Sequence, residues 1–269
     1  MDQNRSTLAL VTLAGATLAA AIAGPRVGGP DPAIMFAVLF ASLTSSITGF
    51  AFSAVCGAIL FHLSSDHVRM IDLMIGCSVA NQAAMVWSLR RDIAWRKVAA
   101  LVAAGLCGVP VGAWLLLHTD RVLFGYGVGA VLLAYGTYLP FGRPWARGCD
   151  SVWADAAAGF MGGVIGAAAA LPSLPLTIWS QSRGLDRGAQ RSLCQPFILA
   201  MQLASLLALG VMPTGHGGGF EPADLLCVPA GLFGTQIGMG CYRGLSNRAF
   251  AMAGSALLIV SGLSFLLSA

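Results

Sequence analysis

Charged residues are scarce in this chain. They make up 10% of its 269 residues, whereas hydrophobic residues make up 57%, and the mean hydropathy is +0.78. A water-soluble domain of this length would not normally tolerate such a composition. The sequence also lacks a basic arm, so the formal net charge of +4 bears on orientation in a membrane and does not indicate a nucleic-acid partner. We therefore predict an integral membrane protein.

Catalytic and cofactor-binding motifs are absent as well. The sequence has no HExxH, no GxSxG, no Walker or dinucleotide glycine pattern, and no paired carboxylates within an apolar run. The seven cysteines stand singly, without a C-x-x-C pair, so we interpret most of them as small packing residues. These absences disfavour an enzyme, and we predict neither a cofactor nor a metal.

Long apolar runs fill the chain instead, and most match the roughly 20 residues that a helix needs to cross the hydrocarbon layer. None alternates in polarity as a strand of a membrane barrel would. We therefore predict an all-α polytopic membrane protein. The first run resembles a secretory signal, but we favour a retained helix. In chain order the runs are Thr7–Gly24, Ala33–Leu63, Val68–Leu89, Lys97–Leu117, Val122–Phe141, Ala154–Ser180, Leu193–Pro213, Ala223–Tyr242 and Ala249–Leu267.

The chain also repeats itself. The glycine-rich segment Gly105–Gly112 recurs about 126 positions later as Gly231–Gly238. Gly49 and Cys77 match Gly166 and Cys194 at an offset of about 117. We predict an N-terminal helix and loop in residues 1–32, a first repeat in 33–148 and a second repeat in 149–269. The small residues of the repeated segment lie nearly on one helical face, which favours close helix contact.

Two runs in matching positions, Ala33–Leu63 and Ala154–Ser180, are too long for one straight span. They contain breaks at Ser45–Gly49 and Leu171–Pro175. Such breaks are expected only where the chain is buried in protein or lines a wet cavity. The basic loops fall on one side of the membrane best if each broken run is a re-entrant hairpin. We therefore predict two inverted repeats, each opening with a hairpin, with about seven full spans in addition.

The polar residues inside the predicted spans are mostly neutral. Amide side chains either join helices or line a site, because an unbonded amide is costly in a membrane. Hydroxyl groups beside broken half-helices, together with the exposed NH groups there, suit an oxyanion, although such hydroxyls also bond to the carbonyl four residues earlier. Arg191 either guides an anion inward or sets the topology. The candidate substrate-binding residues are Gln195, Gln202, Asn81, Gln82, Ser173, Thr177, Ser53 and Arg191.

Two other function classes stay open. His62, Asp66 and His67 stand together at a predicted hairpin end, where they could serve a membrane-embedded enzyme, with or without metal. The chain could also be an accessory membrane subunit that needs a partner.

The two-half layout, the broken opening of each half and the late glycine helix in each half resemble the sulfite exporter TauE/SafE family, also called the 4-toluene sulfonate uptake permease family. The resemblance runs from about Ala33 to Leu267, and its motifs are Ile47–Phe50 in the first half and Gly162–Gly166 followed by Leu171–Pro175 in the second. It implies a multi-pass permease of the bacterial inner membrane for sulfite, sulfonates or related small anions. We expect alternating access around a midplane site between the repeats, with the lipid bilayer and the anion as partners and a homodimer by analogy.

Overall fold

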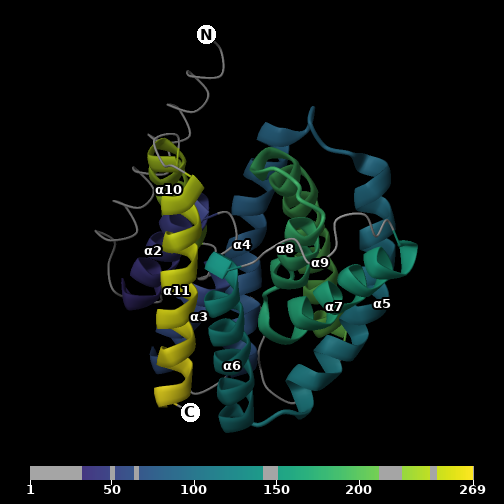
Figure 1. Ribbon diagram of the computed structural model, residues 1–269. Coiled ribbons are helices and arrows are strands. Elements are labelled where there is room, and N and C mark those ends of the chain that lie inside the picture. The colour runs from purple at the N-terminus through teal and green to yellow at the C-terminus, as the bar shows by residue number, and fades with distance from the viewer. Residues whose placement is uncertain are drawn as a thin grey trace.

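The computed structural model describes residues 32–48, 52–63, 67–141, 151–211, 226–242 and 247–268. These ranges hold ten α-helices and no strand (Figure 1). The predicted helix Thr7–Gly24 lies outside them. The helices are α2 (Pro32–Thr48), α3 (Phe52–Leu63), α4 (His67–Leu89), α5 (Trp95–His118), α6 (Arg121–Phe141), α7 (Val152–Ala169), α8 (Ser173–Ser182), α9 (Arg187–Val211), α10 (Cys227–Tyr242) and α11 (Asn247–Ser268).

Four of the helices, α4, α5, α7 and α9, are long and apolar enough to cross a membrane. The 24 residues of α5, for example, rise about 36 Å, which exceeds the hydrocarbon thickness of about 30 Å. The prediction of an all-helical polytopic membrane protein is therefore confirmed. The number of spans and the inverted arrangement of the repeats stay predictions.

Each of the two long runs is broken, but the predicted breaks at Ser45–Gly49 and Leu171–Pro175 extended too far into the neighbouring helices. α2 ends at Thr48 and α3 begins at Phe52, and α7 ends at Ala169 before α8 begins at Ser173. Between α7 and α8, Ala170 adopts a left-handed conformation with φ of 56°, which reverses the chain after the last turn of α7. The ten residues of α8 rise about 15 Å, half of the hydrocarbon layer. α7 is itself long enough for a span, which the hairpin prediction did not include.

α7 and α8 fold back on each other as a hairpin. The Asp155 carboxylate in the first turn of α7 accepts hydrogen bonds from Trp179 Nε1, at 2.9 Å, and from the Arg183 guanidinium at the end of α8. The α2–α3 pair is held differently at its end. There Arg121, at the start of α6, donates to the Phe61 carbonyl, and His62 contacts Ser264 Oγ of α11 at 2.9 Å.

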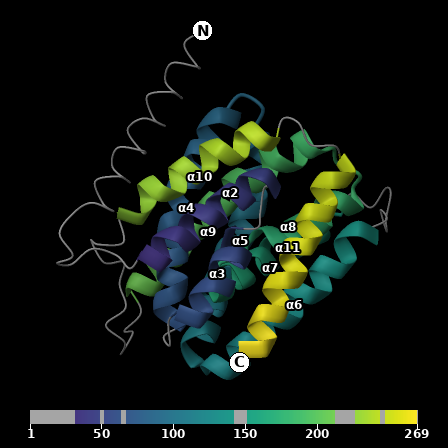
Figure 2. The ribbon, with the colours of Figure 1, turned by 90° about the vertical axis from the view of Figure 1, so that its left-hand side faces the viewer.

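The most extensive helix contacts join residues 33–148, here called the first half, to residues 149–269, the second half. They pair α5 with α7, α2 with α10 and α6 with α11. Figure 2 shows α2 beside α10, and α6 beside α11. Glycines allow the backbones to approach, because a Cβ on Gly108 would overlap the Phe160 carbonyl oxygen and one on Gly234 would overlap that of Leu39. The predicted close packing of the repeated glycine segment is thus confirmed.

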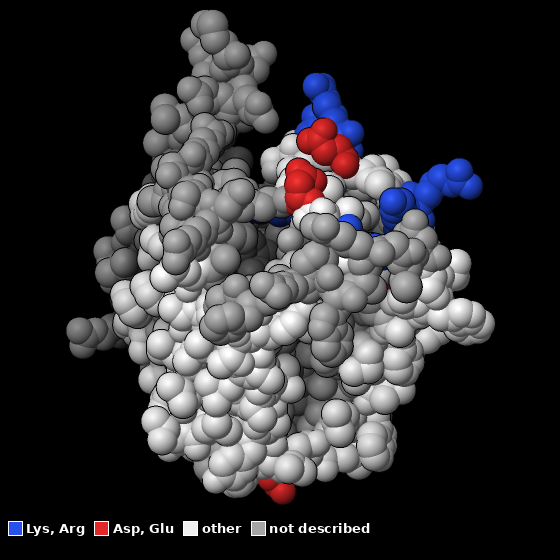
Figure 3. Space-filling model, in the orientation of Figure 1, with Lys and Arg blue, Asp and Glu red and all other residues white. Residues whose placement is uncertain are grey.

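Lys and Arg side chains gather at one end of the described molecule (Figure 3). This end carries the α4–α5 connection, as Figure 1 shows. The positive-inside rule predicts that this end faces the cytoplasm. The basic residues that flank this connection are Arg90, Arg91, Arg96 and Lys97.

Candidate functional site

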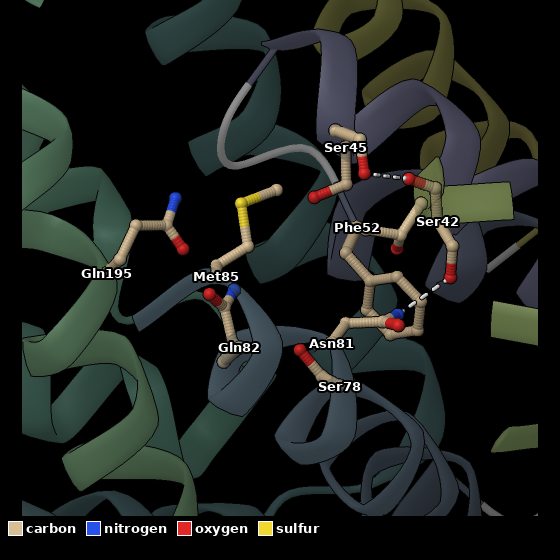
Figure 4. Close-up of a pocket in the computed structure, with 10 residues that line it drawn as sticks. Ser42, Ser45, Phe52, Ser78, Asn81, Gln82, Met85 and Gln195 are labelled. Atoms are coloured by element: carbon tan, nitrogen blue, oxygen red, sulfur yellow. Dashed lines mark hydrogen bonds between the residues drawn. The ribbon is translucent and has the colours of Figure 1, made fainter. Parts of the chain in front are cut away.

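A small polar cavity lies where α2, α3 and α4 of the first half meet α9 and α10 of the second (Figure 4). Its volume of about 10 Å³ corresponds to about one water molecule. All of the side chains that line it are uncharged. They are Ser42, Ser45, Ser46, Phe52, Ser78, Asn81, Gln82, Met85, Gln195 and Thr235.

Helical spacing explains why the lining residues converge. On α4, Ser78, Gln82 and Met85 recur every three to four residues and therefore share one face. On α2, Ser42, Ser45 and Ser46 follow the same spacing. Both faces are buried, so each hydroxyl or amide must find a partner within the protein, in water or in a ligand.

Gly231 of α10 makes room for a hydrogen bond at the heart of this cavity. A Cβ at this position would lie 3.1 Å from Ser42 Oγ and 3.2 Å from Asn81 Nδ2. Those two atoms form a hydrogen bond of 2.8 Å between α2 and α4. The repeated glycine segment, which the sequence assigned to the scaffold, therefore also borders the cavity.

A second amide–hydroxyl pair lies nearby. Gln202 Nε2 of α9 donates to Ser78 Oγ of α4 at 2.7 Å and joins the two halves. The carbonyl oxygens of Asn81, Gln82 and Gln202 are buried and accept no hydrogen bond from the described part of the chain. A buried unsatisfied acceptor costs about 1–3 kcal/mol, so acceptors at a cavity indicate a place where a ligand or water binds.

Five of the predicted site residues are at or beside this cavity. Asn81, Gln82 and Gln195 line it, and Figure 4 shows Gln82 and Gln195 flanking Met85. Gln202 contacts the lining through Ser78. Arg191, one turn before Gln195, donates to the backbone carbonyl of Ser46 at 2.9 Å. Their roles as substrate ligands stay predictions.

The other three predicted residues are not part of this lining. Ser53 follows the lining residue Phe52 and is itself buried. Thr177 Oγ1 donates to the Ser173 carbonyl at 2.8 Å, which is the bond to the preceding turn that competes with a ligand role. Among the described residues no group of three His, Cys, Asp or Glu side chains could hold a metal ion, and Asp66 lies outside them.

Several lining residues were not among the predicted ones. Ser42, Ser45 and Ser46 stand at helical spacing in the apolar run Ala33–Leu63, which was the available signal. Ser45 and Ser46 were instead assigned to the chain break, although α2 continues to Thr48. Thr235 was overlooked because it lies within the repeated glycine segment.

These features define a multi-pass helical membrane protein with a buried, uncharged polar cavity between its two halves. The family model of the sulfite exporter TauE/SafE matches residues 34–265. Because this match covers most of the chain, the protein belongs to the TauE/SafE family, which is a family of membrane transporters and not of enzymes. No curated protein and no solved structure matches the chain.

Proposed function

We propose that this protein is a secondary permease for small sulfur-containing anions, such as sulfite or organosulfonates, in a bacterial inner membrane. The observation that carries the proposal is the buried polar cavity, whose lining offers hydroxyl and amide groups and no carboxylate. Cation sites in membranes use carboxylates or converging carbonyl groups, whereas an anion needs hydrogen-bond donors. Membership of a sulfite exporter family supports a sulfur-containing anion as the substrate.

Alternating access between two inverted repeats is the mechanism that we propose. The helix contacts support this mechanism. The glycine-rich helix of each half, α5 or α10, packs on the first helix of the other half, α7 or α2. A space for about one water cannot hold a sulfur atom with three oxygens. The described state is therefore closed around the cavity, and substrate enters when the helices of the two halves separate.

Arg191 has a proposed role in that movement. Its guanidinium on α9 contacts the Ser46 carbonyl near the end of α2, so one cation lies beside the cavity without lining it. A positive charge in this position lowers the electrostatic cost of bringing an anion out of water. Separation of α9 from α2 would break the contact and turn the guanidinium toward the incoming anion.

Thermal unfolding of the full-length, detergent-purified protein tests this function. A ligand present at 100 times its Kd stabilises the folded state by about 2.7 kcal/mol. We expect sulfite or a short sulfonate to raise Tm selectively. Stabilisation by carboxylates or metal cations, with no effect of any sulfur anion, would refute the proposed substrate class.

A substitution tests the position of the site. Gln195→Ala removes a hydrogen bond to a charged ligand, worth about 1.5–3 kcal/mol, so sulfite affinity should fall about tenfold or more. Gln181→Ala is the matched control, because Gln181 lies on α8 and does not line the cavity. If the two variants bind sulfite with equal affinity, Gln195 is not part of the binding site.

A further inference from the structure

The two amide–hydroxyl pairs have a defined direction. Asn81 Nδ2 donates to Ser42 Oγ, and Gln202 Nε2 donates to Ser78 Oγ. A serine oxygen that accepts such a bond still has its own hydrogen to donate. Both serines line the cavity, so each can direct an O–H donor at a ligand there. The amide behind each hydroxyl also polarises it and strengthens the bond that it donates.

The same cavity also offers acceptors. Asn81 and Gln82 line it and are only 7% and 6% exposed, and their amide oxygens accept no hydrogen bond from the described residues. These oxygens need a donor. An oxyanion without hydrogen, such as sulfite dianion, sulfate or a sulfonate, has only acceptors and leaves them unsatisfied.

The charge balance favours a single negative charge. No charged side chain lines the described cavity, and Arg191 contributes one positive charge beside it. The Born cost of moving an ion out of water grows with the square of its charge, so a dianion costs about four times as much as a monoanion of the same size. An uncharged lining cannot offset that cost.

We propose that the cavity selects a monoanionic oxyanion that keeps one hydrogen on oxygen, with hydrogen sulfite as the probe species. When the two halves separate and the cavity widens, the ionised oxygens of this anion accept from the Ser42 and Ser78 hydroxyls, and its O–H donates to the amide oxygen of Asn81 or Gln82. The selectivity rests on the permease function proposed above and makes it more specific. Sulfite dianion is excluded by charge, and a sulfonate binds more weakly because it lacks the donor.

Isothermal titration of the full-length protein in detergent tests the selectivity with three probes. Sulfite is titrated at pH values below and above its second ionisation. Methanesulfonate serves as a monoanion that lacks an O–H group, and sulfate serves as a dianion that lacks one. Above that ionisation the apparent Kd for total sulfite should rise about tenfold per pH unit, because the binding species becomes rarer. Methanesulfonate should bind at least about tenfold more weakly than hydrogen sulfite. Its affinity should not vary with pH, which separates titration of the ligand from titration of the protein.

A pair of variants assigns the effect to the cavity. Gln82→Met removes the lining amide at nearly constant shape, and Gln181→Met makes the same change on α8, away from the lining. Gln82→Met should reduce the preference for hydrogen sulfite over methanesulfonate about tenfold, and Gln181→Met should leave it unchanged.

The outcomes separate the two proposals. Sulfite affinity that rises or stays constant with pH, or methanesulfonate that binds as tightly as hydrogen sulfite, overturns the selectivity and leaves the permease function standing. If the Kd of methanesulfonate changes with pH as much as the Kd of sulfite does, the selectivity is also overturned and the permease function still stands. Failure of every sulfur anion to bind refutes both.

Discussion

The two halves of the molecule contain similar helix junctions, but the side chains at these junctions differ. In the first half, α2 carries Ser42, Ser45 and Ser46 against α4 and α10, around the polar cavity. In the second half, α7 carries Gly159, Gly162 and Gly163 against α5 and α9. There a Cβ on Gly162 would lie 2.8 Å from the ring of Phe197. Phe197 and Met201, both fully buried, fill the corresponding space with apolar atoms.

The difference shows which part of the repeat is scaffold and which part is site. The backbone approach is duplicated, since Gly108 and Gly112 contact the carbonyls of α7 as Gly234 and Gly238 contact those of α2. The side chains are not duplicated. By these contacts, Gly163, Gly166 and Ala167 of α7 stand where α2 has Ser42, Ser45 and Ser46. These residues have no hydroxyl group, and an aromatic ring packs against α7 instead of a polar cavity. The departures from the repeat therefore locate the candidate site.

Substitution of the contact glycines should have the largest effect. In Gly108→Val and Gly234→Val the new side chain meets a backbone carbonyl that cannot rotate away. Overpacking typically costs about 1–3 kcal/mol, and we expect the upper part of this range or more in both variants. The loss of stability is measured as a lower Tm of the purified protein and as loss of its monodisperse peak in size-exclusion chromatography. Gly127→Val is the control, because a Cβ there would meet no atom within 4 Å outside the neighbouring backbone of α6. If one of the two pairings tolerates valine, the halves do not share one scaffold.

Exchange of residues between the halves should have an intermediate effect and sharpen the comparison. Asn81 lies beside Gly231 and Met201 lies beside the matching Gly105, and both are buried. Asn81→Met removes the partner of Ser42 and should weaken sulfite binding about tenfold or more. Met201→Asn buries an amide in the apolar junction and should lower the free energy of unfolding by about 1–3 kcal/mol or more.

Binding by the folded fraction of Met201→Asn should be unchanged, because the apolar junction holds no ligand. Titration calorimetry and thermal unfolding of both variants provide the measurements. A loss of binding in Met201→Asn equal to that in Asn81→Met would place the site in both halves.

The sequence predicted the helices and the close contacts of the repeated glycines well, because length, hydropathy and glycine spacing are local properties of the chain. It also predicted the amides Asn81, Gln82 and Gln195, since polar residues in apolar runs are conspicuous. It could not show that the cavity lies in one junction and not in both. That depends on Phe197 and Met201, which look like ordinary apolar residues until the packing places them opposite Gly162 and Gly105. Likewise, the bond from Thr177 to the Ser173 carbonyl depends on the local backbone, which composition does not specify.

The smallest effect is expected where the two hairpins end. The α7–α8 hairpin is closed by its own residues, with Asp155 bonded to both Trp179 and Arg183, whereas the end of α3 is held by Arg121 of α6 and by α11. The Asp155 and Arg183 side chains are 35% and 18% exposed, so water screens their ion pair. The ion pair should therefore contribute no more than about 1 kcal/mol to the free energy of unfolding. Asp155→Ala also removes the hydrogen bond from Trp179, which is worth about 0.5–1.5 kcal/mol.

Hydrogen exchange can separate this local effect from global stability. Asp155→Ala should speed exchange in α8 and leave α3 unchanged, because α3 is held by helices that the substitution does not touch. Asp92→Ala changes an exposed carboxylate beside the α4–α5 connection and should alter neither helix. Faster exchange in both α3 and α8 after Asp155→Ala would mean that the hairpins open together. The two ends would then form one cooperative unit despite their different contacts, and movement of one hairpin during transport would require movement of the other.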